Sequence, residues 1–104
     1  MKAVLVQTTV PERHWGEKLA EELLNLKLAA CVWILPPMTA YYTWEGKRES
    51  AEEHLVVIKT FDDHRSGVER RLKALHPYDC PEILTIHTDY VESGYLSWMR
   101  DVMT

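Results

Sequence analysis

Residues 29–61 read AACVWILPPMTAYYTWEGKRESAEEHLVVIKTF, and this stretch decides the fold. Its first arm, residues 29–44, is apolar and rich in β-branched and aromatic residues. Glu45-Gly46 forms a tight turn and Lys47–Phe61 returns as the second arm, so the pattern predicts a long β-hairpin. The first arm is predicted to be two strands in series, because Pro36-Pro37 cannot donate hydrogen bonds to a β-ladder.

The predicted hairpin is too long for the body of one domain. The sixteen residues of its first arm reach roughly 50 Å at about 3.3 Å each, whereas a compact chain of about 100 residues has a radius of gyration of about 13 Å. A monomer would leave Tyr42 and Trp44 of the distal half in water, and an isolated two-stranded ribbon is marginally stable. We therefore expect an obligate homo-oligomer with both residues in its interface. A solvated, flexible hairpin is the alternative.

A strand and a helix are predicted before the hairpin. Lys2–Thr8 is a short β-branched run of strand length. The helix that follows is expected to start after an N-cap at Thr9 and to end near Lys27. Its apolar face consists of Trp15, Leu19, Leu23 and Leu26.

After the hairpin we predict a helix over Asp62–Leu75, a strand over Glu82–His87 and a terminal helix over Tyr90–Met103. The inward face of the terminal helix is expected to consist of Tyr95, Trp98, Met99 and Val102. The order β-α-β-β-α-β-α is the ferredoxin-like pattern with an extra C-terminal helix. The predicted fold class is therefore α+β, a four-stranded antiparallel sheet with helices on one face.

Length and composition exclude several classes of protein. The length fits a single domain over residues 1–104. Twelve Lys and Arg against sixteen Asp and Glu give a net charge of -4, and the basic residues are scattered, so we expect no nucleic-acid partner. No apolar run approaches the roughly 20 residues that span a bilayer, so we expect no membrane role. Two cysteines without a signal peptide indicate free thiols and a cytoplasmic protein.

The densest cluster of reactive side chains is HPYDCPEI, residues 76–83. Each proline fixes its own φ and disfavours the helical region for the residue before it, so His76 and Cys80 are expected to be extended. The segment is therefore predicted to be a stiff loop. It is either a functional site or only the junction between a helix and a strand.

Short blocks across essentially the whole chain resemble the CutA divalent-cation-tolerance family, and they occur in the family's order. They are Ala29–Val32, Tyr42–Lys47, Ile58–Thr60, His76–Tyr78, Pro81–Ile83 and Tyr95–Trp98. The resemblance implies a cytoplasmic homotrimer of ferredoxin-like subunits that exchange hairpin strands, associated with tolerance to divalent metals, chiefly copper. It also implies an architecture similar to that of PII nitrogen-signalling trimers. Trp33 and Pro37 depart from the family, which usually has a small polar residue and Gly there.

The resemblance also implies where a metal would bind. In copper-binding members the proposed ligands are a cysteine at the end of the first strand and two successive histidines, and here those positions are Thr8, Leu75 and His76. Cu(I) prefers thiolate, whereas Cu(II) and Zn(II) accept imidazole. The candidate donors for copper or another divalent metal are therefore His76, Cys31 and Cys80. Cys31 lies in an apolar strand and is also typical of a small buried hydrophobe.

Other functions stay open beside the metal site. A PII-like signalling or scaffold trimer would bind a small ligand in an intersubunit cleft. The expected lining of that cleft is Lys59, Tyr78, Glu82 and Trp98. An enzyme would use His76 as base and Cys80 as nucleophile, but the sequence supplies neither an oxyanion hole nor a substrate pocket. We therefore predict a non-enzymatic, trimeric metal-response protein whose metal contact includes His76, with the PII-like trimer as the alternative.

Overall fold

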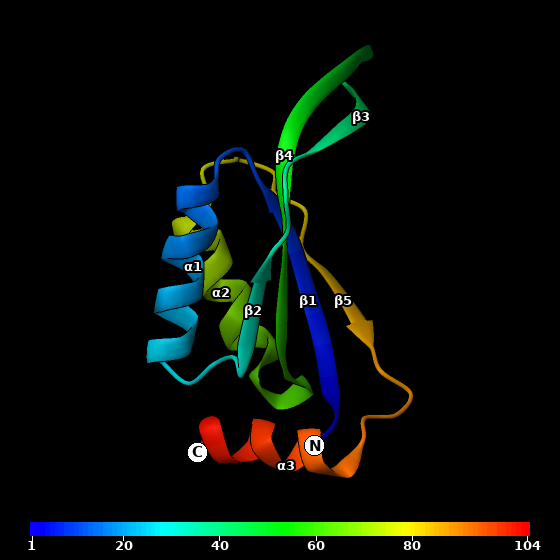
Figure 1. The fold of residues 1–104 in the computed structure, drawn as a ribbon. Coiled ribbons are helices and arrows are strands. Elements are labelled where there is room, and N and C mark those ends of the chain that lie inside the picture. Colours follow the sequence, from blue (N-terminus) through cyan, green and yellow to red (C-terminus); the bar gives the residue numbers. More distant parts are fainter.

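The computed structural model describes all 104 residues (Figure 1). Its elements are β1 (Ala3–Val10), α1 (Arg13–Asn25), β2 (Cys31–Ile34), β3 (Met38–Trp44), β4 (Lys47–Phe61), α2 (Arg65–Leu75), β5 (Leu84–His87) and α3 (Ser93–Val102). A short 3-10 turn, Asp62–His64, leads from β4 into α2. This order confirms the predicted α+β, ferredoxin-like pattern with an extra C-terminal helix.

The strands form one antiparallel sheet in the order β2-β4-β1-β5, and β3 pairs with β4 beyond the end of β2. Strand β1 pairs with β4 over its full length, from Ala3 opposite Phe61 to Val10 opposite His54. Helices α1 and α2 cover one face, and α3 lies across the end of the sheet near the N-terminus (Figure 1). The sheet has five strands instead of four, because Pro36-Pro37 interrupts the first arm of the hairpin.

The core lies between the sheet and the two helices. Side chains alternate between the faces of a strand, and Val4, Val6, Val56 and Ile58 all point towards α1 and α2 and are fully buried. The whole cluster consists of Val4, Val6, Val10, Leu19, Leu23, Ala29, Val56, Ile58, Val68 and Leu72. A smaller cluster attaches α3 to the strand ends and consists of Ala3, Ala30, Phe61, Met99 and Met103.

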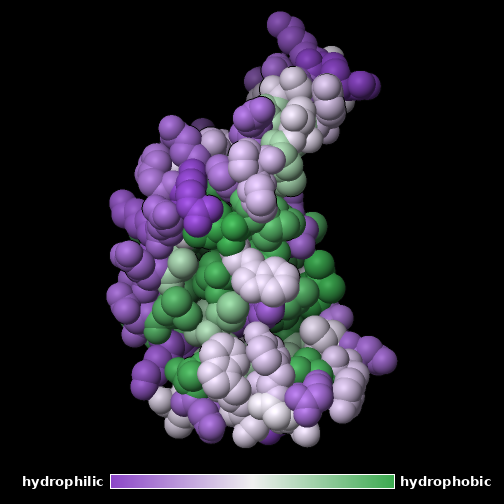
Figure 2. All heavy atoms as spheres, in the orientation of Figure 1, coloured by the Kyte–Doolittle hydropathy of each residue, from purple (hydrophilic) through white to green (hydrophobic).

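The opposite face of the sheet, which we call the open face, carries no helix over its middle (Figure 1). Its side chains alternate with those of the core. Over the middle of the sheet they are Leu5, Gln7, Cys31, Trp33, Val57, Lys59, Leu84 and Ile86. Trp33, Leu84 and Ile86 are 52 %, 51 % and 44 % exposed. Figure 2 shows apolar side chains gathered over the middle of the molecule, whereas polar side chains dominate the helices and the hairpin tip.

The hairpin of β3 and β4 extends beyond the body, as the sequence predicts (Figure 1). The molecule measures 45 × 27 × 24 Å, and residues 41–50 are all exposed. At the tip Glu45 and Gly46 have φ angles of 49° and 78°. Positive φ at both central residues is typical of the type I′ turn, whose twist matches that of the paired strands.

Two predictions for the first helix were wrong, its N-cap at Thr9 and the place of Leu26 on its buried face. Thr9 does not cap α1, because β1 continues to Val10 and Thr9 pairs with Leu55 of β4. Glu12 occupies the N-cap position instead. At the other end Leu26 is exposed, since the helix stops at Asn25 and Lys27 reverses the chain with a φ of 56°.

The inward face of α3 is narrower than its sequence suggested. Met99 is buried as predicted, but Tyr95, Trp98 and Val102 are each about two-fifths exposed. The helix rests on the end of the sheet rather than on its middle, so its buried contacts are centred on Met99 and Met103, with Leu96 packed beside them. At 10 to 13 residues, none of the three helices is long and apolar enough to cross a membrane.

Candidate functional site

His76 lies where α2 ends and the stiff loop begins. Its backbone has φ -73° and ψ 137°, an extended conformation that the following proline favours. Its N–H still donates to the carbonyl of Leu72, at 2.9 Å. The extended backbone confirms the prediction for His76. It directs the ring away from the helix and towards the end of β1.

Both ring nitrogens of His76 are engaged by the protein. The backbone N–H of Tyr78 donates to Nδ1 at 3.1 Å, so Nδ1 carries a lone pair. Nε2 lies 2.9 Å from the carbonyl oxygen of Thr9 and 3.0 Å from Oγ1 of Thr8. A carbonyl oxygen can only accept, so Nε2 carries the proton and donates it to Thr9. The geometry therefore defines a neutral imidazole protonated on Nε2.

The surroundings of the ring keep it neutral. Partial burial lowers the pKa of His76, while the carbonyl of Thr9 and the charge of Glu53 act in the opposite direction. Burial dominates, and the pKa lies below its ordinary value. A neutral histidine with both nitrogens hydrogen-bonded orients the loop rather than offering a free lone pair.

Glu53 joins this loop to the base of the hairpin. It lies on β4 opposite Met38, the first residue of β3. Its Oε2 accepts from the hydroxyl of Tyr78 at 2.8 Å and from Oγ1 of Thr9 at 3.2 Å. Burial, followed by the hydrogen bond to Glu53, raises the pKa of Tyr78. On the same loop Glu82 accepts from Nε2 of Gln7 at 3.1 Å.

A second cluster surrounds Lys59 on the open face. Its Nζ lies 3.7 Å from the ring centroid of Trp33, which is cation–π distance, and donates to the hydroxyl of Tyr95 at 3.3 Å. The rings of Tyr95 and Trp98 lie 5.3 Å apart with a tilt of 36°. Strand β4 positions the lysine, β2 positions Trp33 and successive turns of α3 position the other two aromatic residues.

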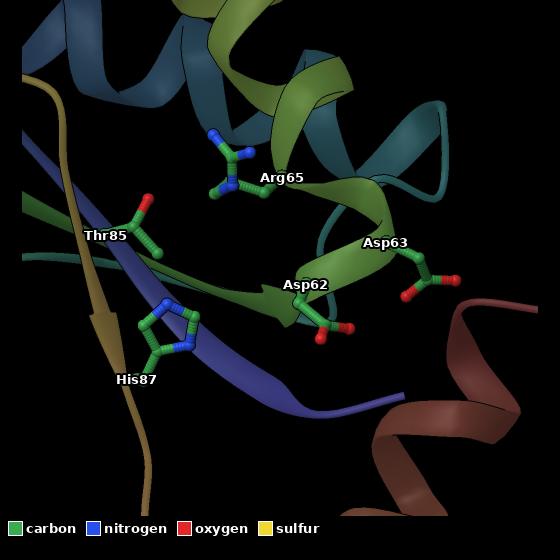
Figure 3. Close-up of a pocket in the computed structure, with 5 residues that line it drawn as sticks. All are labelled: Asp62, Asp63, Arg65, Thr85 and His87. Carbon is green, nitrogen blue, oxygen red and sulfur yellow. The ribbon is translucent and has the colours of Figure 1, made fainter.

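A polar hollow of about 600 Å³ lies between β5 and the start of α2. Its lining consists of Asp62, Asp63, Arg65, Thr85 and His87 (Figure 3). The backbone N–H of Lys2 donates to Asp62 and is the main reason why the pKa of Asp62 is lowered. Arg65 is already paired with Glu69. The hollow has no hydrophobic lining residue, so it lacks the apolar wall that small-molecule sites typically have.

The sequence and the fold of this chain both match those of known proteins. The sequence model of the CutA1 divalent ion tolerance protein family matches residues 4–102. The chain belongs to this family. The divalent-cation tolerance protein CutA of Pectobacterium atrosepticum is 39% identical over 98 residues, which cover 94% of this chain and 89% of that relative. The protein of the same name from Citrobacter koseri is 39% identical over 99 residues, covering 95% and 86%.

Solved structures of the family have the same fold. CutA from Xylella fastidiosa superposes with a TM-score of 0.95 at 33% identity and covers 100% of both chains. CutA1 from Ehrlichia chaffeensis has a TM-score of 0.94 at 30% identity, covering 100% of this chain and 98% of the other. The Archaeoglobus fulgidus structure, described as a periplasmic divalent cation tolerance protein, has a TM-score of 0.94 at 32% identity and covers 98% and 99%. The family and the fold predicted from the sequence are both confirmed.

The metal donors predicted from the sequence, His76, Cys31 and Cys80, do not converge within one chain. Cys31 pairs with Lys59 on the open face, whereas His76 contacts Thr8, which points towards the helices. Cys80 is exposed on the loop, and Cys31, predicted to be buried, is only half-buried. No group of three or more His, Cys, Asp or Glu side chains is placed to hold a metal ion. One chain therefore offers a single imidazole, which does not fit a metal site of three or four ligands.

The predicted cleft residues fall into two separate sets of contacts in one chain. Lys59 and Trp98 both contact Tyr95, whereas Tyr78 and Glu82 belong to the loop near Glu53 and Gln7. Sequence reasoning missed Trp33, Tyr95 and Glu53 as members of these clusters. The spacing of Tyr95 and Trp98, three apart on a helix, was an available signal for the cluster around Lys59. Glu53 gave no such signal, because its partners are distant in the sequence.

Proposed function

We propose that this protein acts as a homotrimer in divalent-cation tolerance, in the cytoplasm and without catalytic activity. The observation that carries the proposal is the open face together with the projecting hairpin. Large apolar side chains stay exposed there in one chain, namely Trp33, Tyr41, Tyr42, Trp44, Leu84 and Ile86. Contiguous exposed apolar surface is typical of an interface, and aromatic residues dominate interface energetics.

The proposed assembly places the hairpin against neighbouring subunits. Tyr42 and Trp44 lie on β3, beyond the part of the sheet that α1 and α2 cover. A two-stranded ribbon gains independent stability only by packing on something else. Neighbouring chains that cover the ribbon and the open face would remove both exposed surfaces at once. Free thiols at Cys31 and Cys80 support the cytoplasmic assignment, because reducing compartments keep thiols unpaired.

The metal contact that we propose includes His76. The relatives and structural neighbours are named for divalent-cation or divalent-ion tolerance. Because one chain supplies a single imidazole at this point, copper or another divalent metal would need further donors from neighbouring subunits, with Cys31 and Cys80 as candidates. A metal bound at Nδ1 of His76 would replace the hydrogen bond from Tyr78.

Isothermal titration of the assembled protein with Cu(II), Cu(I) and Zn(II) tests the metal contact. The wild type should bind at least one of these ions, the His76→Ala variant should lose that site, and His14→Ala should keep it. His14 is an exposed histidine of α1 and controls for binding to surface imidazoles. Equal binding by the wild type and His76→Ala would remove His76 from the metal site.

A second candidate function is a PII-like signalling or scaffold trimer that binds a small ligand between subunits. The observation that favours it is the cation of Lys59 among three exposed aromatic residues, an arrangement suited to a ligand. The metal titration separates the two candidates, since the second requires no metal site.

A further inference from the structure

Lys59 is a cation without an acidic partner. The three ion pairs of the structure join Arg13 to Glu17, Arg65 to Glu69 and Arg71 to Glu22, and all lie elsewhere. The neighbours of Lys59 on the open face carry no carboxylate. They are Leu5 and Cys31 on the adjacent strands and Val57 and Phe61 along β4. No ion pair within the chain therefore neutralises the charge of Lys59, and Glu82, the carboxylate that reaches the open face, accepts from Gln7 instead.

The aromatic residues around Lys59 hold its ammonium group in place. Trp33 lies under the cation at 3.7 Å, and the hydroxyl of Tyr95 accepts one of its N–H groups. An ammonium group has three donors, so at least one remains for a ligand. In one chain Trp33, Tyr95 and Trp98 keep 52 %, 38 % and 42 % of their surface exposed, and this is ring surface that a planar ligand or a neighbouring subunit would cover.

We propose that Lys59, Trp33 and Tyr95 form a binding site for a small organic anion, a carboxylate or phosphate attached to a flat ring. The anionic group would accept a hydrogen bond from the free N–H of Lys59. The ring would pack against Trp33 or Trp98, since offset and edge-to-face aromatic contacts are favourable. A bare anion gains little at an exposed lysine, so the ring is a necessary part of the ligand.

A bound anion would also compensate the positive charge of Lys59 when chains assemble. Covering the open face with another subunit would bury the ammonium of Lys59, and an unpaired buried charge is strongly unfavourable. A bound anion offsets that charge. This inference deepens the second candidate function and rests on it for the ligand's role, but it requires neither a metal nor a particular number of subunits.

The test compares matched probes on the full-length protein. The probes are 2-naphthoate, 2-naphthyl phosphate and the neutral 2-naphthamide, with binding measured by isothermal titration and by the NMR signal of the Trp33 indole N–H. The wild type should bind at least one of the two anions about tenfold more tightly than the amide. The two anionic probes distinguish a carboxylate ligand from a phosphate ligand.

Variants assign the binding to the site. Lys59→Met should abolish the preference for the anion, and Trp33→Asn should weaken binding of the anion and the amide alike. Lys18→Met is the matched control, because Lys18 lies 5.7 Å from the ring centroid of Trp15 on α1, far from the open face. It should bind the probes like the wild type. Equal binding of anion and amide, or an unchanged preference in Lys59→Met, would overturn the proposal.

Light scattering of the same samples measures their oligomeric mass, and it therefore tests the proposed assembly independently of the anion site. Absence of probe binding at an unchanged oligomeric mass would overturn the anion site and leave the assembly intact. Absence of probe binding in the wild type, combined with loss of assembly in Lys59→Met, would also overturn it. That result would assign the ammonium to a carboxylate of a second copy of the chain.

Discussion

His76 is the residue whose role changes most between sequence and structure. Its sequence position suggests a ligand, but its two nitrogens hold the end of β1 and the backbone of the loop together. The carbonyl of Thr9 can only accept and the N–H of Tyr78 can only donate, so protonation of Nδ1 would break the second bond. The neutral ring is therefore part of the folded structure.

The lowered pKa of His76 predicts a pH dependence of stability. Because the unfolded chain binds the proton at about the ordinary pKa of 6.5 and the folded chain at a lower pH, stability from this residue is full above pH 6.5 and is lost as pH falls through the folded pKa. Urea unfolding at pH 7.5 and 5.5 should show a larger loss of free energy for the wild type than for His76→Gln. The exposed His14→Gln variant should behave like the wild type, and a matching loss in His76→Gln would contradict the prediction.

Tyr78 is predicted to stabilise the loop through Glu53. Replacing Tyr78 with Phe leaves Oε2 of Glu53 with the hydroxyl of Thr9 as its one remaining donor. Hydrogen bonds to charged groups contribute about 1.5–3 kcal/mol, and partial exposure here reduces the expected loss to about 1–2 kcal/mol. Urea unfolding measures it. Tyr90→Phe, at a residue that is 78 % exposed, is the control and should change stability very little.

At the scale of elements, the sequence predicted the strands of the hairpin better than the helix ends. Strand β4 has the predicted bounds, and β2 and β3 divide at the predicted prolines. These features follow from local rules, since proline and turn chemistry act within a few residues. Thr9 failed as a cap because pairing with Leu55 outweighed its local preference. The clusters at Glu53 and Lys59 depend on contacts between distant segments, which no local pattern encodes.

The turn of the hairpin allows a paired test with opposite signs. Gly46 has a φ of 78° and no atom within 4 Å of an added Cβ, so Gly46→Ala acts through backbone strain alone. The expected loss of stability is about 1 kcal/mol. Glu45→Asn should stabilise instead, because Asn tolerates the positive φ that Glu45 adopts at 49°. Thermal unfolding of both variants checks this, and a stabilising Gly46→Ala would contradict the turn geometry.

At the scale of the whole molecule, one chain has an exposed apolar sheet face and an unsupported ribbon. The proposed association of identical chains would cover both of them. One chain supplies neither a complete metal site nor a closed ligand cleft. An assembly would have to complete them.

Trp44 is predicted to be a major contact of that assembly. It is 51 % exposed in one chain, and truncating a buried interface tryptophan costs about 2 kcal/mol or more. Trp44→Ala should therefore dissociate at higher concentrations than the wild type in a dilution series followed by light scattering. Tyr90→Ala removes an exposed aromatic outside the hairpin and the open face, and it should leave the dissociation unchanged. The same dissociation for Trp44→Ala and the wild type would remove Trp44 from the interface.

The most direct test of the proposed function is the mass of the protein in dilute solution, measured by light scattering after size-exclusion chromatography. One chain has a mass of 12.2 kDa. We predict a single species of three chains, about 37 kDa, because the open face and the hairpin need neighbouring subunits to cover them. A monodisperse species of 12.2 kDa would contradict the homotrimer and, with it, a metal site or a ligand cleft completed by neighbouring subunits.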